Sequence, residues 1–415
     1  MVITINKNEL RGGVVIPPSK SVAHRALICA AVRGKKTRIR CTELSEDIEA
    51  TMRCLRSLGY DVDREGEFID VGATRKDVSS PTLDCGESGS TFRFVLPLAA
   101  ALGCGATFVG AGRLGKRPMD ELYSELERHG IVIEHPQGSS LPSTISGKCM
   151  GGSFSIRGDI SSQYITGLLL AFPLMEECRL GIVGRIESKP YIDITIDVLK
   201  NFGYSVIDEG GVFVYNGYNE NSIEEYTVEG DYSNGAFFVV GGLIGAKDEL
   251  EIFGLSRETK QGDKAIIDIM TRFGGRIDEV GDSLIVHSSS LHGTAVNVSD
   301  TPDLAPIIAV AAAAAHGRTV IDGCARLRAK ESDRIESTLA LINGLGGMAC
   351  SDGDKIIVEG SGRLRGGKVS SYGDHRIAMS AAIASLICDG DVIIDGAEAV
   401  AKSFPRFFEL LDSLS

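Results

Sequence analysis

The chain has 415 residues, of which 43% are hydrophobic and 24% are charged, and its formal net charge is −13. This length exceeds what one ordinary core can organise and predicts two or three domains. The acidic balance argues against non-specific nucleic-acid binding, and no apolar run approaches the roughly 18 residues of a membrane helix. A negative net charge is compatible with small anionic substrates, because the charges next to the binding site decide whether such a substrate binds.

The cysteines and the first residues bear on cellular location. Ten cysteines are scattered along the chain, with no Cys-x-x-Cys pair and no histidine clustered near them. They are expected to be reduced, mostly buried thiols and not a disulfide or zinc framework. Residues 1–6 alternate like a strand and lack the layout of a signal peptide. These features predict a cytoplasmic protein without a metal site.

A sixfold internal repeat organises the chain. In each repeat a turn rich in glycine, serine or aspartate runs into an apolar stretch long enough for a buried helix, and successive starts lie about 70 residues apart. The starts are residues 18–21, 86–90, 158–162, 230–233, 300–303 and 373–376. Each carries cap-type residues. A helix N-terminus has partial positive charge and free N–H groups, so a converging set of starts makes an anion site.

Strands and helices alternate within each repeat. The first repeat predicts a strand at 13–16, a helix at 21–31, a strand at 37–40 and a helix at 45–58 that ends before Gly59. Later repeats predict helices at 119–129, 192–202 and 263–273, each followed by a glycine and a strand such as 131–133. This alternation indicates an α/β fold. The polar, turn-rich stretch 216–227 predicts the crossing between two halves of three repeats each.

Basic residues recur at the turns of different repeats. An isolated Lys or Arg is usually surface charge, but this recurrence in an acidic chain favours binding of a multiply anionic substrate. The residues are Lys20, Arg25, Arg93, Arg113, Lys116, Arg117, Lys330, Arg334, Arg376 and Lys402.

Two charged segments have more than one interpretation. The segment 330–334 fits either an exposed charge network on a helix or a pair of anion-binding cations, Lys330 and Arg334, beside a proton donor, Glu331. The segment 374–376 fits a buried hydrogen-bonded cluster at a helix start. Neither segment decides the function by itself.

Eight segments in this order resemble the 5-enolpyruvylshikimate-3-phosphate synthase family (3-phosphoshikimate 1-carboxyvinyltransferases), and the resemblance covers essentially the whole chain. Each segment is weak alone, whereas their succession is specific. The segments are Pro18–Arg25, Gly89–Arg93, Arg117–Met119, Ser161–Tyr164, Ser188–Asp193, Lys330–Arg334, Asp374–Arg376 and Lys402–Pro405.

The resemblance implies an α/β fold with two inside-out α/β barrel domains, each of three βαβαββ repeats. It implies that residues 1–14 and 229–415 form one domain and residues 15–228 the other, with the active site in the cleft between them. A monomer is expected, with small-molecule substrates and neither nucleic acid nor membrane as a partner.

The resemblance also implies the reaction. The enolpyruvyl group of phosphoenolpyruvate is transferred to the 5-hydroxyl of shikimate 3-phosphate, with release of phosphate, by addition and elimination. This is a step of the shikimate pathway of aromatic amino acid biosynthesis and the target of glyphosate, and it uses no cofactor. Both substrates carry phosphate and carboxylate, so several cations must converge. Protonating the methylene and deprotonating the hydroxyl require an acid and a base.

Site residues follow from the matching segments. The implied phosphoenolpyruvate ligands are Lys20, Gly89, Arg117, Gln163, Arg334, Arg376 and Lys402. The implied shikimate-3-phosphate ligands are Lys20, Ser21, Arg25, Ser161, Ser162, Gln163, Ser188, Asp303 and Lys330. Asp303 is the implied base and Glu331 the implied acid, with Lys20 and Lys402 as further candidates for proton transfer.

Three residues depart from the family pattern, and two other functions remain as alternatives. Glu87, Arg326 and Phe94 stand where Asn, Asn and Pro are common, which leaves glyphosate sensitivity open. A UDP-N-acetylglucosamine enolpyruvyl transferase normally has a reactive cysteine in its mobile loop, and residues 112–118 contain none. A non-catalytic anion-binding protein on the same scaffold would need the basic residues but neither Asp303 nor Glu331.

Overall fold

The computed structural model describes residues 1–6, 8–220, 223–281 and 283–415. The chain divides into two compact units. Unit 1 consists of Met1–Pro17 and Glu229–Ser415, and unit 2 consists of Pro18–Val228. Each unit has its own hydrophobic core. Among the described residues, no helix combines the length and the apolar character needed to cross a membrane.

Unit 2 contains three four-stranded sheets that share one pattern, in which the first two strands are parallel and the remaining pairs antiparallel. The pattern matches one βαβαββ unit per sheet. In sheet order, the strands are β14 (Glu225–Thr227), β3 (Thr37–Arg40), β5 (Phe68–Arg75) and β4 (Tyr60–Glu65); β6 (Thr82–Asp84), β7 (Ala106–Val109), β9 (Ser143–Ser146) and β8 (Val132–Glu134); and β10 (Gly151–Arg157), β11 (Glu176–Val183), β13 (Val212–Tyr218) and β12 (Tyr204–Asp208).

The helices of unit 2 begin and end close to the glycines and cap residues of the sequence. They are α1 (Lys20–Arg33), α2 (Glu46–Ser57), α3 (Gly89–Leu102), α4 (Asp120–Arg128), α5 (Ser162–Ala171) and α6 (Lys189–Asn201), with short 3-10 turns η1 (Leu114–Lys116) and η2 (Phe172–Leu174). The predicted helices at 21–31, 45–58, 119–129 and 192–202 are therefore confirmed within a few residues.

Two sheets of unit 1 repeat the four-stranded pattern, and its third sheet has three strands, of which, in sheet order, the first two are antiparallel and the last two parallel. In sheet order, its strands are β16 (Arg276–Val280), β17 (Ser283–His287), β15 (Glu249–Phe253) and β2 (Gly13–Val15); β18 (Ala295–Asn297), β19 (His316–Asp322), β21 (Lys355–Ser361) and β20 (Met348–Asp352); and β1 (Val2–Ile5), β23 (Val392–Asp395) and β22 (Gly367–Ser370). Its helices are α7 (Tyr232–Gly245), α8 (Ile266–Arg272), α9 (Ala305–Ala314), α10 (Arg334–Gly344), α11 (His375–Ala384) and α12 (Phe407–Ser413), with 3-10 turns η3 (Gly262–Ala265), η4 (Pro302–Leu304), η5 (Ala325–Ala329), η6 (Ser385–Ile387) and η7 (Ala397–Lys402). The helix predicted at 263–273 is thus a 3-10 turn followed by a short α-helix.

The central helices of unit 1 are buried because they are apolar on every side. Helices α7, α9 and α11 pack on one another, and nearly all their residues are buried. In unit 2, α5 packs against α1, α3 and α6. The helix starts that bear the predicted ligands are consequently anchored on rigid core elements.

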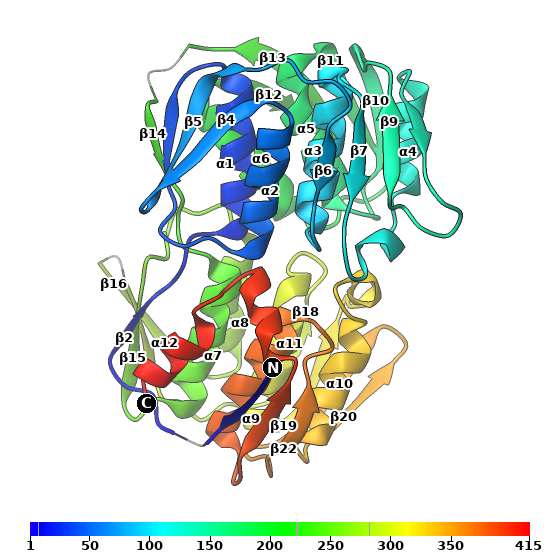
Figure 1. Ribbon diagram of the computed structural model, residues 1–415. Helices are drawn as coiled ribbons and strands as arrows, with labels where there is room; N and C mark the ends of the chain where they lie inside the picture. The colour runs from blue at the N-terminus through cyan, green and yellow to red at the C-terminus, as the bar shows by residue number, and fades with distance from the viewer. Residues whose placement is uncertain (7, 221–222, 282) are drawn as a thin grey trace. The chain divides into compact units, whose positions relative to one another are not determined.

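Two chain crossings join the units, and the first differs from the expected position. Strand β2 pairs with β15 of unit 1 (Figure 1), so the first crossing follows Pro17 and not residue 14. The second crossing follows Val228. The predicted crossing segment 216–227 is wrong as a linker. Its described residues include the end of β13 and all of β14, whose backbone groups pair with other strands of unit 2. Residues 221–222 of that segment lie outside the described residues.

The cysteine prediction is confirmed. All ten cysteines are free thiols; Cys350 is exposed, Cys104 is half-buried, and the others are buried. Burial raises the pKa of Cys41 and of Cys178 to about 12, so both thiols stay protonated at neutral pH.

Close packing between α3 and α5 depends on Gly167. Pro97 lies inside α3 and has no N–H to donate to the Arg93 carbonyl one turn before it. Gly167 of α5 approaches this carbonyl so closely that an added Cβ would lie 2.1 Å from its oxygen. Because the atom that the new Cβ would meet belongs to the backbone, the clash can be relieved only if the two helices move apart.

We expect Gly167→Ala to destabilise unit 2 by about 1–3 kcal/mol, the usual cost of overpacking a core. Urea unfolding followed by circular dichroism measures this change. The matched control is Gly181→Ala in β11, where an added Cβ meets its nearest neighbour at 3.8 Å. Equal urea midpoints for Gly167→Ala and Gly181→Ala would show that α3 and α5 can move apart without loss of stability.

Candidate active site

The residues implied by the sequence divide between the two units, and each group is described in its own unit. Unit 2 carries Lys20, Ser21, Arg25, Gly89, Arg117, Ser161, Ser162, Gln163 and Ser188, whereas unit 1 carries Asp303, Lys330, Glu331, Arg334, Arg376 and Lys402.

Serine caps the starts of α1, α2, α3 and α5 in unit 2. The side chains of Ser19, Ser88 and Ser161 accept hydrogen bonds from backbone N–H groups in the first turns of α1, α3 and α5. A serine cap is neutral, so it satisfies one N–H without cancelling the partial positive charge of the helix end. The first residues of α1, α3 and α5, which are Lys20, Gly89 and Ser162, are all predicted ligands.

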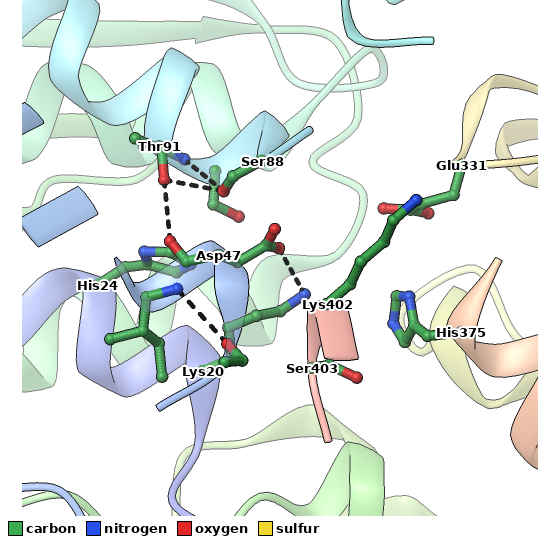
Figure 2. A network of polar contacts seen from close by, with 12 residues as sticks. Lys20, His24, Asp47, Ser88, Thr91, Glu331, His375, Lys402 and Ser403 are labelled. Atoms are coloured by element: carbon green, nitrogen blue, oxygen red, sulfur yellow. Dashed lines mark hydrogen bonds and ion pairs between the residues drawn. The ribbon is translucent and has the colours of Figure 1, made fainter. Parts of the chain in front are cut away.

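Lys20 is held by a polar network that also ties the starts of α2 and α3 together (Figure 2). Its Nζ donates to Asp47 Oδ2 at 2.9 Å, and both side chains are largely buried. The Thr91 hydroxyl contacts the Asp47 backbone carbonyl at 3.3 Å and the Ser88 hydroxyl at 2.8 Å. The network therefore fixes a cation beside two helix N-termini. Asp47 belongs to no segment used for the family resemblance, so sequence reasoning did not identify it.

Gly89 makes room for two arginines at the start of α3. An added Cβ would lie 2.5 Å from Arg117 Nη1 and 3.3 Å from Arg93 Nη1. Arg93 Nη1 donates to Gln163 Oε1 at 2.6 Å, and its Nη2 donates to the Pro118 carbonyl at 3.1 Å. The structure thus brings Gly89, Arg117 and Gln163 together. It also adds Arg93 to this group, a basic residue for which the sequence did not imply a substrate contact.

Arg25 connects four helices of unit 2. Its Nε donates to Thr195 of α6 at 2.8 Å, its Nη2 donates to Thr166 of α5 at 3.3 Å, and its guanidinium lies 5.1 Å from the ring centroid of Phe94 of α3. Burial lowers the pKa of Arg25 to about 10, which leaves it charged at neutral pH. Phe94 is itself buried, so this departure from the family pattern is a core residue that packs under Arg25.

Ser188 has an unusual backbone conformation for a serine. Its φ is 54° and ψ is 42°, and it lies at the start of α6 with its side chain buried. Non-glycine residues in the left-handed region cost free energy and persist where the surroundings impose them, often at functional sites. The geometry agrees with a positioned hydroxyl at this helix start.

Three cations surround Asp303 in unit 1. Its Oδ1 accepts from Arg334 Nη1 at 2.7 Å and from Lys330 Nζ at 3.2 Å, and its Oδ2 accepts from Arg376 Nη2 at 3.0 Å. Burial alone raises the pKa of Asp303, but Arg376, Lys330 and Arg334 outweigh burial and hold the pKa well below its ordinary value. Asp303 is therefore an anion at neutral pH, and its cations come from two segments, 330–334 and 374–376.

Arg334 is the most buried cation of this cluster, with 1% of its side chain exposed. Its Nη2 donates to Glu331 Oε2 at 2.7 Å, and its Nε donates to Asp374 Oδ2 at 2.8 Å. Burial lowers the pKa of Arg334, but Asp374, Glu331 and Asp303 more than compensate and hold it above its ordinary value. Asp374, which the sequence left as an unassigned buried cluster, orients this arginine.

The segment 330–334 is not the exposed helical charge network that its spacing allowed. Helix α10 begins at Arg334, and Asp333 caps it by accepting from the N–H groups of Ile335 and Glu336. Lys330 and Glu331 precede the helix in non-helical backbone. Their convergence on Asp303 and Arg334 therefore comes from the turn and not from helical spacing.

Lys402 ends the 3-10 turn η7, and its Nζ donates to the Gly373 carbonyl at 2.8 Å. Next to it, the Ser403 carbonyl accepts from Asn234 Nδ2 of α7 at 3.3 Å. These bonds hold Lys402 near the turn before α11, whose first turn carries Arg376.

The other two departures from the family pattern are Glu87, in a turn, and Arg326, in η5. The Glu87 carboxyl group contacts the backbone of Gly112, where an added Cβ would lie 2.5 Å from Glu87 Cδ. Arg326 Nη2 donates to the Ser299 carbonyl at 3.1 Å.

Asp263 is a buried carboxyl group that sequence reasoning missed. It lies in η3, inside the stretch expected to be helical, and accepts a hydrogen bond from the Ser233 hydroxyl. Burial, and the nearby charge of Asp303, raise the pKa of Asp263 to about 6 despite opposing effects of Arg376 and Ser233. A carboxyl group with this pKa binds a proton more tightly in the folded chain than in the unfolded chain.

We expect Asp263→Asn to stabilise the protein at pH 7 by on the order of 2 kcal/mol, because it removes the cost of ionising a buried group. The raised pKa makes the native state bind more protons between about pH 4 and pH 6, so wild-type stability falls as pH rises through this window. The advantage of the variant should therefore vanish near pH 4. Urea unfolding at pH 4 and pH 7 measures it, and a variant less stable than wild type at both pH values would contradict the assignment.

Comparisons with known proteins agree with this geometry. Residues 5–411 match the family described as EPSP synthase (3-phosphoshikimate 1-carboxyvinyltransferase). A 3-phosphoshikimate 1-carboxyvinyltransferase of Clostridium kluyveri is 40% identical over 99% of this chain and 97% of its own length, and that of Clostridioides difficile is 37% identical over 98% and 96%.

Solved structures show the same fold. An EPSP synthase from Acinetobacter baumannii matches 100% of this chain and 98% of its own with a TM-score of 0.83 and 27% identity. The enolpyruvyl transferase NikO from Streptomyces tendae, at 18% identity, matches with a TM-score of 0.80 and supports the fold alone. The fold is that of the two-domain enolpyruvyl transferases, and the chain belongs to the EPSP synthase family, the 3-phosphoshikimate 1-carboxyvinyltransferases.

Proposed function

We propose how the residues of the two units divide the work of the family reaction. As a 3-phosphoshikimate 1-carboxyvinyltransferase, the chain transfers the enolpyruvyl group of phosphoenolpyruvate to shikimate 3-phosphate in the shikimate pathway. Asp303 removes the proton of the attacking 5-hydroxyl, and Glu331 protonates the methylene carbon, with Lys20 and Lys402 as further groups for proton transfer. The observation that carries this assignment is a carboxylate, Asp303, held among three cations of unit 1.

The cations and helix starts bind the substrate anions. Phosphoenolpyruvate contacts Lys20, Gly89, Arg117, Gln163, Arg334, Arg376 and Lys402. Shikimate 3-phosphate contacts Lys20, Ser21, Arg25, Ser161, Ser162, Gln163, Ser188, Asp303 and Lys330. Each set includes residues of both units.

The remaining features follow from the family reaction. Its substrates are small phosphorylated acids, so the enzyme needs neither nucleic acid nor membrane. Free, mostly buried thiols are the pattern of a reducing compartment, which supports a cytoplasmic location. The three-repeat units each enclose a core of their own, which supports a monomer.

Phosphate release from phosphoenolpyruvate tests the reaction directly. We expect release that requires shikimate 3-phosphate and persists in chelated, metal-free buffer. Release that requires UDP-N-acetylglucosamine would assign the chain to the sister reaction, and no release from folded protein would favour an anion-binding protein.

Asp303→Asn should lower kcat by about 100-fold to 10,000-fold, because the amide cannot accept the hydroxyl proton. The steady-state rate of phosphate release measures this loss, and circular dichroism checks the fold. The matched control is Asp322→Asn, which removes a half-exposed partner of Lys355 in the same unit. Full activity of the Asp303 variant would exclude the residue as the base.

Gly89→Ala should raise the KM for phosphoenolpyruvate by about 10-fold or more, since Arg117 must move away from a new Cβ 2.5 Å from its Nη1. The displaced atom ends a flexible side chain, so stability should change little. Gly181→Ala, with ordinary spacing around its Cβ, is the control. A KM equal to that of wild type would show that Arg117 has room to adjust without losing its contact.

A further inference from the structure

The guanidinium of Arg334 is occupied by carboxylates on both of its binding edges. Asp374 takes the side edge, where Nε and Nη2 donate to its two oxygens at 2.8 and 3.3 Å. Asp303 and Glu331 share the end edge, where Nη1 and Nη2 each donate at 2.7 Å. An arginine has five N–H donors and binds a carboxylate best through two parallel bonds along one edge. An incoming carboxylate therefore cannot bind in this way unless a resident one leaves.

The three resident carboxylates differ in how firmly they are held. Asp374 is fully buried, caps α11 through the Arg376 N–H at 3.0 Å and accepts from the Ser332 hydroxyl at 3.0 Å. Asp303 and Glu331 retain 19% and 20% exposure of their side chains. Asp374 is thus part of the fold, whereas the other two are partly exposed, and Asp303 keeps Lys330 and Arg376 as partners when it leaves Arg334.

We propose that the carboxylate of phosphoenolpyruvate replaces Asp303 and Glu331 on the end edge of Arg334, so that the substrate itself releases the base and the acid. This inference rests on the proposed assignment of Arg334 as a phosphoenolpyruvate ligand. Its chemistry is an exchange of ion pairs in which no covalent bond forms or breaks.

The exchange makes Asp303 a stronger base. The groups that face it are Lys330, Arg334, Arg376 and Glu331, together with Asp263 of η3. The three cations keep the pKa of Asp303 far below the range useful for removing a hydroxyl proton. A substrate anion on Arg334 and Arg376 offsets their charge, while burial and Asp263 continue to favour the protonated form. Asp303 then gains affinity for a proton when the substrate to be attacked is in place.

Glu331 benefits in a second way. While Arg334 Nη2 holds its carboxylate, that group is engaged away from any substrate carbon. Release from the arginine allows the partly exposed carboxylate to take a proton from water and to transfer that proton to the methylene carbon. One exchange therefore prepares both groups, and it also limits proton transfer when no substrate carboxylate is bound.

Equilibrium binding of phosphoenolpyruvate, measured by isothermal titration calorimetry without acceptor, tests the exchange. A carboxylate that must be displaced opposes binding, so Glu331→Gln and Asp303→Asn should each lower the Kd by 3-fold or more while lowering kcat. Asp374→Asn should raise the Kd by 10-fold or more, because Arg334 loses its orienting partner. Glu336→Gln is the matched control on the exposed face of α10, where the residue lies 3.5 Å from Arg328, and it should leave both constants unchanged.

The outcomes separate this inference from the assigned reaction. Weaker or unchanged binding in both the Glu331 and Asp303 variants would overturn the exchange, even with full wild-type turnover. Tighter binding in these variants would support it even if the wild-type protein released no phosphate. Thermal unfolding checks that each variant folds. If Asp374→Asn does not fold, the combination of a lower Kd with a lower kcat in Glu331→Gln decides the question. Failure of wild-type protein to bind phosphoenolpyruvate would overturn both.

Discussion

The capping of buried helices is the constraint on which the charge arrangement of this protein depends. The central helices of both units are enclosed by apolar core, so the N–H groups of their first turns need acceptors at the one end that reaches polar surroundings. In unit 2 serine caps three of them, at Ser19, Ser88 and Ser161. In unit 1 aspartate caps α7 and α11, at Asp231 and Asp374. The same fold therefore presents neutral caps in one unit and anionic caps in the other.

This difference shapes the two halves of the candidate site. Neutral caps leave the helix dipoles of unit 2 available to anions, and Lys20 and Arg117 add full charges at the same turns. In unit 1 the carboxylates and cations are interlocked, with Arg334 bound to three acidic side chains. Asp303 stands at the third helix start of unit 1, inside the 3-10 turn that precedes α9. Its carboxylate accepts hydrogen bonds from three cations.

Sequence reasoning succeeded where the signal was local. Serine and aspartate at helix starts and glycine at helix ends located α1, α2, α4 and α6 within a few residues, because caps and left-handed turns select these residue types. It failed in the stretch 216–227, where polar residues end β13, which pairs with the preceding strand β12, and form β14, which pairs with the distant strand β3. It also did not identify Asp47 and Asp263, and it left Arg93 and Asp374 without a specific partner, because these residues act through contacts with residues distant in sequence.

The sequence by itself determined the repeat, the α/β class, the reduced thiols and the family, because each is encoded in residue type and spacing along the chain. The tertiary structure alone decided the partners of the charged groups. Lys330 and Arg334 reach Asp303 through a turn that their helical spacing did not predict, and Asp374 reaches Arg334 from another helix start. The physical reason is that an ion pair depends on distance and burial in space, which the separation of two residues along the chain does not specify.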